Sequence, residues 1–256
     1  MAKRLLYIVG NWKMNLTVHE GSLLLHALDQ AIESHEGVEI VLAPSFLALQ
    51  SMSLQADRNR FKLAAQNLYW RDEGAFTGEV SANQLRGLVK YAIIGHSERR
   101  NIFGERGRDI GRKVQASIRN EIKPILCVGE SALERSDIET NEVLYDQIVG
   151  GLSNLTSDDM EHVLIAYEPI WAVGSGKSAV PADVKDVAKI IRAQVKHMFG
   201  DKVAGKVPIL YGGSVDSSNA AAFLDTDGVD GLLIGGASLE AKQFAKIIDK
   251  AQDKQK

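Results

Sequence analysis

The chain has 256 residues, of which 45% are hydrophobic and 25% are charged, and its formal net charge is −3. This composition is typical of a soluble globular protein and gives no overall attraction to nucleic acid or to an anionic membrane, so an anion-binding site has to be built locally. No apolar stretch approaches the roughly 18 residues of a membrane span, and the short apolar run near the start lacks a full signal core, so we expect a cytoplasmic protein. The single cysteine, Cys127, has no partner for an internal disulfide or a zinc site, and we expect it to be a buried small side chain.

Short, nearly continuous apolar runs rich in β-branched residues predict eight strands. The runs cover 5–10, 38–43, 62–66, 91–95, 123–129, 162–167, 207–213 and 229–236. Amphipathic stretches between them predict helices over 18–34, 107–120, 141–152 and 182–199. Strands that are apolar on both faces and alternate with helices are typical of a parallel α/β sheet.

The arrangement of these units favours a single α/β domain over residues 1–256, folded as a (β/α)8 barrel. Eight units in 256 residues leave 32 residues for each, enough for one strand, one helix and two short connections. An open, doubly wound sheet is the structural alternative, and no linker or low-complexity tract divides the chain.

Polar residues and glycines that stand out from the apolar pattern follow the ends of the predicted strands. They are Asn11, Lys13, His96, Glu168, Ser214, Gly235 and Gly236. In a parallel barrel every strand finishes at the same rim, so these residues would converge on one small site. An open sheet would spread them apart, and this difference favours the barrel.

Glu168 directly follows the apolar run 162–167, and it is followed by Pro169 and a loop that contains Gly174. A carboxylate held under a hinged cover is suited to general-base chemistry on a small anionic substrate, because the cover excludes water. The two hinges would be 169–171 and 177–179, with the N–H of Gly174 turned toward a phosphate. The alternative is an acid that caps a helix or pairs with a surface lysine.

The segment GSGKS at 174–178 invites comparison with a nucleotide-binding P-loop. The match fails because the first glycine of that motif would fall at Trp171, and the loop does not directly follow a strand. We therefore expect no ATP or GTP site there. The basic cluster at 99–113 has no interleaved aromatic residues apart from Phe103, so we interpret it as a solvated or ion-paired helix face and expect no nucleic-acid binding.

His96 and Lys13 are the other candidate catalytic side chains. His96 follows the strand 91–95 and opens a predicted helix, where the positive end of the helix dipole disfavours the imidazolium form. A neutral imidazole can still polarise a carbonyl, although a purely structural histidine is the alternative. Lys13 lies beside Asn11, and Glu98 could anchor its ammonium, which would leave a fixed positive charge for an oxyanion or phosphate. A solvated surface lysine is the alternative for this position.

Two glycine turns, at 211–215 and 233–238, precede helical segments and could present backbone N–H groups to an anion. Either one alone would be an ordinary turn. Together they follow the last two predicted strands, where barrels of this class commonly bind phosphate.

Read as a set, these segments closely resemble the triosephosphate isomerase family over Gly10 to Leu239. The matching segments are NWKMN (11–15), AAQN (64–67), GAFTGEVSA (74–82), IIGHSERR (93–100), PILCVGE (124–130), AYEPIWAVGSGKSA (166–179), YGGSV (211–215) and GLLIGGASL (231–239). The resemblance implies a (β/α)8 barrel that interconverts D-glyceraldehyde 3-phosphate and dihydroxyacetone phosphate through an enediol(ate) in glycolysis and gluconeogenesis. It also implies that no metal and no organic cofactor are needed.

The resemblance assigns a role to each site residue. Glu168 would be the base and His96 the electrophile, with Lys13 completing the catalytic set. Asn11 and Lys13 would bind the substrate, and backbone amides of Gly174, Ser214, Gly235 and Gly236 would hold its phosphate. Glu98 and Cys127 would support the site.

The segment 74–82 resembles the family's protruding loop, which brings Thr77 beside the partner's Asn11 and Lys13. The resemblance therefore implies a homodimer. A mobile surface loop is the alternative, but the apolar Phe76 argues against it. The chain departs from the usual family pattern away from the site, at 68–73, Gln84, Glu121 and 136–143.

Other classes of function remain open at this stage. A Schiff-base aldolase would need a lysine inside the barrel, and Lys13 is already assigned to charge stabilisation. A metal-dependent epimerase would need clustered His and Asp ligands, which we do not find in the sequence. A catalytically silent phosphosugar-binding barrel is the alternative from a different class.

Overall fold

The computed structural model describes residues 4–136, 139–172 and 179–255. Its centre is a closed barrel of eight parallel strands in the order in which they occur in the chain. The strands are β1 (Leu6–Asn11), β2 (Val38–Ala43), β3 (Phe61–Ala65), β4 (Tyr91–Ile94), β5 (Lys123–Val128), β6 (Leu164–Tyr167), β7 (Ile209–Tyr211) and β8 (Gly231–Ile234). The barrel closes where β8 pairs with β1, with Tyr7 opposite Gly231 and Gly10 opposite Ile234.

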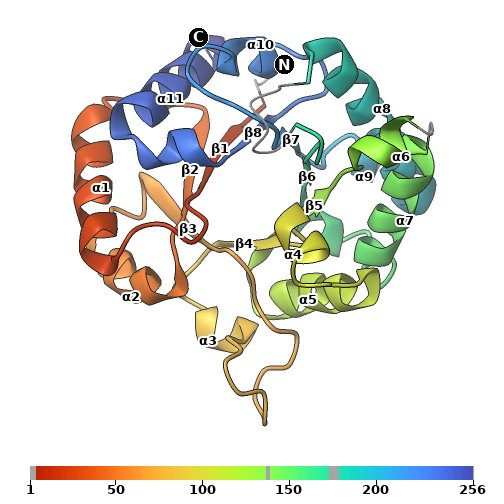
Figure 1. Ribbon diagram of the computed structural model, residues 1–256, viewed down its shortest axis with the longest axis horizontal. Helices are drawn as coiled ribbons and strands as arrows, with labels where there is room; N and C mark the ends of the chain where they lie inside the picture. Colours follow the sequence, from red (N-terminus) through yellow and green to blue (C-terminus); the bar gives the residue numbers. More distant parts are fainter. Residues whose placement is uncertain (1–3, 137–138, 173–178, 256) are drawn as a thin grey trace.

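Helices form a ring around the strands (Figure 1). They are α1 (Val18–Ala31), α2 (Phe46–Gln55), α3 (Ala82–Leu85), α4 (Ser97–Asn101), α5 (Gly107–Arg119), α6 (Ala132–Ser136), α7 (Thr140–Leu152), α8 (Pro181–Phe199), α9 (Asp201–Ala204), α10 (Ala220–Leu224) and α11 (Ala241–Gln255), with the 3₁₀ helices η1 (Asp159–His162) and η2 (Gly236–Leu239). The predicted fold class, a single (β/α)8 barrel, is confirmed.

The predicted strand 162–167 is too long at its start. His162 belongs to η1, and β6 begins at Leu164. The carboxylate of Asp159 accepts hydrogen bonds from the backbone N–H and the hydroxyl of Thr156, both at 2.8 Å, and this closes a turn before the strand. Local side-chain hydrogen bonds of this kind compete with extended structure.

The core has two layers, which explains why the strands are apolar on both faces. Val41 and Ala43 of β2 point into the barrel, whereas Ile40 and Leu42 pack against the surrounding helices. Alternation of this kind fills the barrel with side chains and leaves no pore. Cys127 belongs to the inner layer and is fully buried, as the sequence predicts.

The connection between β3 and α3 projects away from the barrel (Figure 1). Within it, the ring of Tyr69 stacks on Trp70 at 4.1 Å between centroids and packs against Phe76 at 4.7 Å. The N–H of Tyr69 also donates to the carbonyl of Val80 at 2.8 Å. The projecting loop is therefore stabilised by contacts of its own. In the ranges that the structure describes, no helix is both long and apolar enough to cross a membrane.

Helix α5 packs closely on α7 where Gly111 of α5 faces Gly150 of α7. A substitution at this position tests the contact. A Cβ at Gly111 would lie 2.4 Å from the carbonyl oxygen of Gly150, whereas a Cβ at Gly107 would meet nothing closer than 3.9 Å. Gly111→Ala is expected to lower the free energy of unfolding by about 1–3 kcal/mol, because overpacking forces the two helices apart. Chemical denaturation should show this loss, and Gly107→Ala on the same helix is the matched control. Equal stability of the two variants would contradict the packing assignment.

Candidate active site

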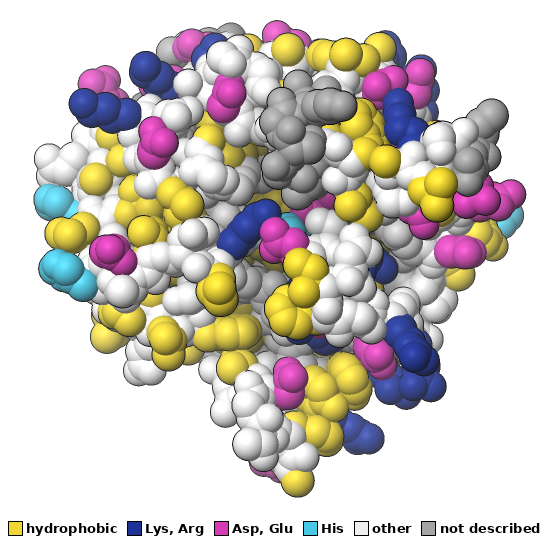
Figure 2. Space-filling view, in the orientation of Figure 1, with side chains coloured by type: hydrophobic (Ala, Val, Ile, Leu, Met, Phe, Trp, Pro, Cys, Tyr) yellow, Lys and Arg dark blue, Asp and Glu magenta, His cyan; other side chains and the backbone are white. Residues whose placement is uncertain are grey.

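A cavity of about 330 Å³ opens at the carboxyl ends of the strands. Its lining includes residues that follow β1, β4, β6, β7 and β8, and in Figure 2 cationic, acidic and histidine side chains meet near the centre of this face. Seven residues predicted for the site line the cavity: Asn11, Lys13, His96, Glu168, Ser214, Gly235 and Gly236. Segments more than two hundred residues apart in the sequence therefore contribute to one site.

The other predicted site residues lie elsewhere. Glu98 contacts Lys13 at the edge of the cavity, and Cys127 is buried in the inner layer of the barrel. Thr77 belongs to the projecting loop and does not line the cavity. Gly174 and the second predicted hinge, apart from Ala179, lie outside the described residues.

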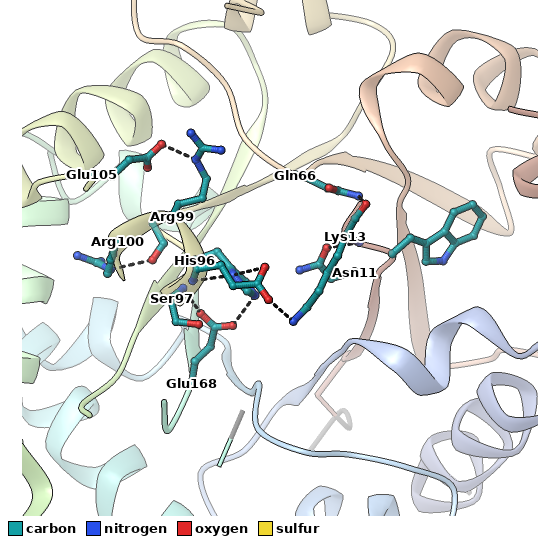
Figure 3. Close-up of polar contacts among 12 residues, drawn as sticks. Asn11, Lys13, Gln66, His96, Ser97, Arg99, Arg100, Glu105 and Glu168 are labelled. Carbon is teal, nitrogen blue, oxygen red and sulfur yellow. Dashed lines mark hydrogen bonds and ion pairs between the residues drawn. The ribbon is translucent and has the colours of Figure 1, made fainter. Parts of the chain in front are cut away.

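Glu168 and His96 are in direct contact (Figure 3). Oε1 of Glu168 lies 2.8 Å from Nε2 of His96, and Oε2 accepts the N–H of Ser97 at 3.0 Å. His96 is the N-cap of α4, where its Nδ1 accepts the N–H of Glu98 at 3.3 Å. Because Nδ1 accepts, the proton of the neutral ring is on Nε2, from which it is donated to Glu168. At 2.8 Å the two side chains leave no space for another group between them.

The two side chains shift each other's pKa. Burial raises the pKa of Glu168, but the facing His96 and the N–H of Ser97 outweigh burial and bring the pKa below its ordinary value. Burial lowers the pKa of His96, but the charge of Glu168, its hydrogen bond to the ring and the charge of Glu98 together outweigh burial and raise the pKa above the ordinary 6.5. The sequence-based expectation that the helix N-terminus disfavours imidazolium therefore has the wrong direction for this arrangement. The cause is a carboxylate against the ring, which the helix argument did not include.

Lys13 has an unusual backbone that several hydrogen bonds hold in place. Its φ angle is 53°, in the left-handed region that costs energy for a residue other than glycine. The N–H of Lys13 donates to the side-chain oxygen of Asn11 at 3.1 Å, and its carbonyl accepts Nε2 of Gln66 at 2.8 Å. Nζ of Lys13 lies 2.6 Å from Oε1 of Glu98. Strain of this kind persists only where the surroundings fix the conformation, as they do here.

Gln66 is a site residue to which the sequence analysis assigned no role. Its Nε2 donates to the carbonyls of both Lys13 and Ala43, each at 2.8 Å. Figure 3 shows its amide directed at the backbone of Lys13. Gln66 directly follows β3, but the sequence analysis placed it at the end of the predicted strand 62–66 and so gave no reason to single it out.

The glycines after β8 form the wall of the cavity next to Lys13. A Cβ at Gly235 would lie 3.5 Å from Cε of Lys13, and Gly236 begins η2. Gly212 lies close to the base, because a Cβ there would be 3.0 Å from Cγ of Glu168. Because glycine has no side chain, these residues leave open space beside Lys13 and Glu168.

Trp171, in the first predicted hinge, is anchored to a buried acid. Glu130 is fully buried, and its Oε1 accepts hydrogen bonds from the hydroxyl of Tyr167 at 2.9 Å and from Nε1 of Trp171 at 3.1 Å. The guanidinium of Arg135 lies 3.3 Å from the same oxygen. The chain that leaves β6 is thus fixed at its start. Among the described residues, no group of three or more His, Cys, Asp or Glu side chains is placed to hold a metal ion.

A closed parallel barrel that carries a buried carboxylate–imidazole pair and a fixed lysine at its carboxyl rim defines a (β/α)8-barrel enzyme. The family model described as triosephosphate isomerase matches residues 6–251. The chain is 43% identical to the triosephosphate isomerase of Chloroherpeton thalassium over 248 residues, which is 96% of this chain and 98% of the relative. It is 41% identical to that of Natranaerobius thermophilus, with 96% and 95% covered, and 40% identical to that of Alkaliphilus oremlandii, with 94% and 98% covered. The chain belongs to the triosephosphate isomerase family.

The coupling between Glu168 and His96 can be measured directly. In Glu168→Gln the ring stays buried but loses the facing charge, so the pKa of His96 is expected to fall from above 6.5 to below it. Nuclear magnetic resonance titration of histidine-labelled protein should show this fall, with the signal assigned through His96→Gln. An unchanged titration would mean that another group raises the pKa of His96.

The same coupling predicts how stability depends on pH. The raised pKa of His96 contributes to the stability of the fold fully below pH 6.5, and this contribution is lost as pH rises through the pKa of the folded state. The lowered pKa of Glu168 contributes to stability fully above pH 4.5, and this contribution is lost as pH falls through the pKa of the folded state. The pair therefore stabilises the fold most between the two ordinary values, 4.5 and 6.5.

Proposed function

We propose that this protein interconverts D-glyceraldehyde 3-phosphate and dihydroxyacetone phosphate in the cytoplasm, as a step of glycolysis and gluconeogenesis. The observation that carries the proposal is the buried Glu168–His96 pair, which faces Lys13 across a small cavity. Membership of the triosephosphate isomerase family supports the same reaction. No feature of the described residues favours a catalytically silent phosphosugar-binding barrel.

Glu168 acts as the general base in this proposal. Its lowered pKa keeps it ionised near neutral pH, so it can accept a proton from the carbon next to the substrate carbonyl. The electrons of the broken C–H bond move to the carbonyl oxygen and form an enediolate. A proton passes from the hydroxyl oxygen on the carbon that lost its hydrogen to the former carbonyl oxygen, and His96 is placed to relay it. Glu168 then returns its proton to the former carbonyl carbon while the other C–O bond becomes the new carbonyl, so aldehyde and ketone exchange with atoms and electrons conserved.

His96 and Lys13 stabilise the negative charge that develops on the substrate oxygen. The N–H at Nε2 of His96 points at Glu168 in the resting arrangement, so it becomes available to a substrate oxygen once Glu168 moves. Lys13 supplies a fixed positive charge, which Glu98 holds in place. Asn11 contacts the substrate from the end of β1, and it also holds the backbone of Lys13.

Backbone amides around the cavity bind the phosphate of the substrate. The proposed donors are Gly174, Ser214, Gly235 and Gly236. Neutral backbone N–H donors, together with the positive charge of Lys13, are suited to binding a phosphate ester. Cys127 is a supporting residue: burial raises the pKa of its thiol, so it stays protonated and inert beneath the base.

The active form is a homodimer in which the loop 74–82 of each subunit reaches the site of the other. Exposed apolar side chains support this: Met14 beside the site is 98% exposed, Leu47 at the start of α2 is 83% exposed, and Phe103 after α4 is 65% exposed. Apolar side chains of this size on neighbouring rim segments are suited to burial against a second subunit. Thr77 would then lie beside the partner's Asn11 and Lys13.

Replacing the base is the direct test of the reaction. Glu168→Gln is expected to lower kcat by at least about 10²-fold, because general-base catalysis contributes on that scale. The assay follows isomerisation of glyceraldehyde 3-phosphate by purified protein, with a chelator present and circular dichroism as the control for folding. Turnover near that of the wild type would remove Glu168 from this role. No turnover by well-folded wild-type protein would overturn the isomerase proposal.

The dimer can be tested separately. Deletion of 76–78 at the loop tip is expected to yield monomers with poor activity, because the projecting loop no longer enters the neighbouring subunit. Analytical ultracentrifugation of the variant and of the wild type measures the change. An unchanged dimer would contradict the assigned contact.

A further inference from the structure

Arg100 is a largely enclosed cation whose partners are backbone carbonyls. It lies on α4, and Figure 3 shows its side chain to the left of His96. Nε donates to the carbonyl of Gly95 at 2.7 Å, and Nη2 donates to the carbonyl of Cys127 at 2.8 Å. Among the described residues no carboxylate forms an ion pair with it, whereas the adjacent Arg99 pairs with Glu105. A charge held this way needs its hydrogen bonds, because leaving it unsatisfied would be costly.

The two carbonyls that Arg100 holds belong to neighbouring strand ends. Gly95 follows β4 and directly precedes His96, and Cys127 lies near the end of β5. Gly95 has a φ angle of 70°, and a Cβ there would be 2.9 Å from Nη2 of Arg100. The glycine thus allows both the left-handed turn and the close approach of the guanidinium. Arg100 links the two strand ends beyond their last paired residues, Ile94 and Leu126.

The peptide that Arg100 holds sets the orientation of the imidazole. The imidazole of His96 is attached next to the peptide between Gly95 and His96, so a rotation of that peptide would change the direction of the ring. Nδ1 would then lose its 3.3 Å contact with the N–H of Glu98, and Nε2 would lose its 2.8 Å contact with Oε1 of Glu168. A planar guanidinium donates two hydrogen bonds in fixed directions, which a lysine ammonium cannot reproduce.

We propose that Arg100 is a positioning residue for His96. By holding the carbonyls of Gly95 and Cys127 together, it keeps Nδ1 as an acceptor and directs the N–H at Nε2 toward the reacting oxygen. Arg100 itself touches no substrate. The kinetic consequence rests on the proposed isomerase function, whereas the orientation and tautomer of His96 do not.

The test compares Arg100→Lys, which keeps the charge but not the two-directional donor, with Arg100→Gln, which is neutral. Both are expected to lower kcat by at least about 10-fold, because small misplacements of a catalytic group have effects on this scale. KM is expected to stay within about three-fold, because substrate binding does not involve Arg100. Above the pKa of His96, nitrogen resonances of the labelled ring should show the Nε2–H form that its contacts predict for the wild type, and loss of that form in both variants.

Arg192→Lys is the matched control. Arg192 also donates to two backbone carbonyls, those of Ala204 and Val207, but it lies at the amino ends of β7 and β8 beside Asp230. Its replacement is expected to lower stability without changing kcat or the resonances of His96. Thermal melting and sedimentation of all variants separate loss of folding from loss of positioning.

The outcomes are distinct. Wild-type kcat and wild-type His96 resonances in folded Arg100→Lys and Arg100→Gln would overturn the proposal. A fall in kcat with unchanged His96 resonances, or an equal fall in Arg192→Lys, would also overturn it, because a general structural effect would then suffice. If the wild type lacked isomerase activity, the proposed function would fail, and the resonances of His96 would still decide whether Arg100 positions the ring.

Discussion

The closure of eight parallel strands into one barrel is the constraint on which the rest of the structure depends. β8 pairs with β1, so the first and last strands are neighbours although more than two hundred residues separate them. Since all parallel strands end at one rim, Asn11, His96 and Glu168 line a single cavity. In an open sheet the ends of β1 and β6 would lie apart. The site is thus a product of closure, and no single segment could form it.

At that rim, burial raises the pKa of Glu168, and contacts with neighbouring groups lower it again. The side chain is only 2% exposed, and burial disfavours its charge. His96 and the N–H of Ser97 compensate, and both lie at the start of α4, where His96 is the N-cap and Ser97 the first helical residue. Gly129 allows the approach from the other side, because a Cβ there would lie 1.8 Å from the carbonyl oxygen of Glu168. These contacts bring the pKa of Glu168 below its ordinary value and hold its carboxylate in place.

The sequence predicted the eight strands because strands buried on both faces have continuous apolar runs. It predicted α1, α5, α7 and α8 because long amphipathic helices show a clear period. It predicted the start of α4 from the position of His96, but it showed no helical period for α2, which is apolar on several sides, or for α3 and α10, which have only four or five residues.

For the site, polar residues after apolar runs were conspicuous, which explains why Glu168 and His96 were found. Gln66 received no role, and Arg100 was interpreted only as part of the basic cluster 99–113. Both donate to carbonyls of segments far along the chain, and no spacing in the sequence records those contacts. Gln66 and Arg100 also show how the segments that follow the strands are held in place at the rim. Gln66 joins the chain after β1 to the end of β2, and Arg100 joins the end of β4 to β5. Side chains that donate to pairs of carbonyls thus continue the connection between strands where the ladder hydrogen bonds stop.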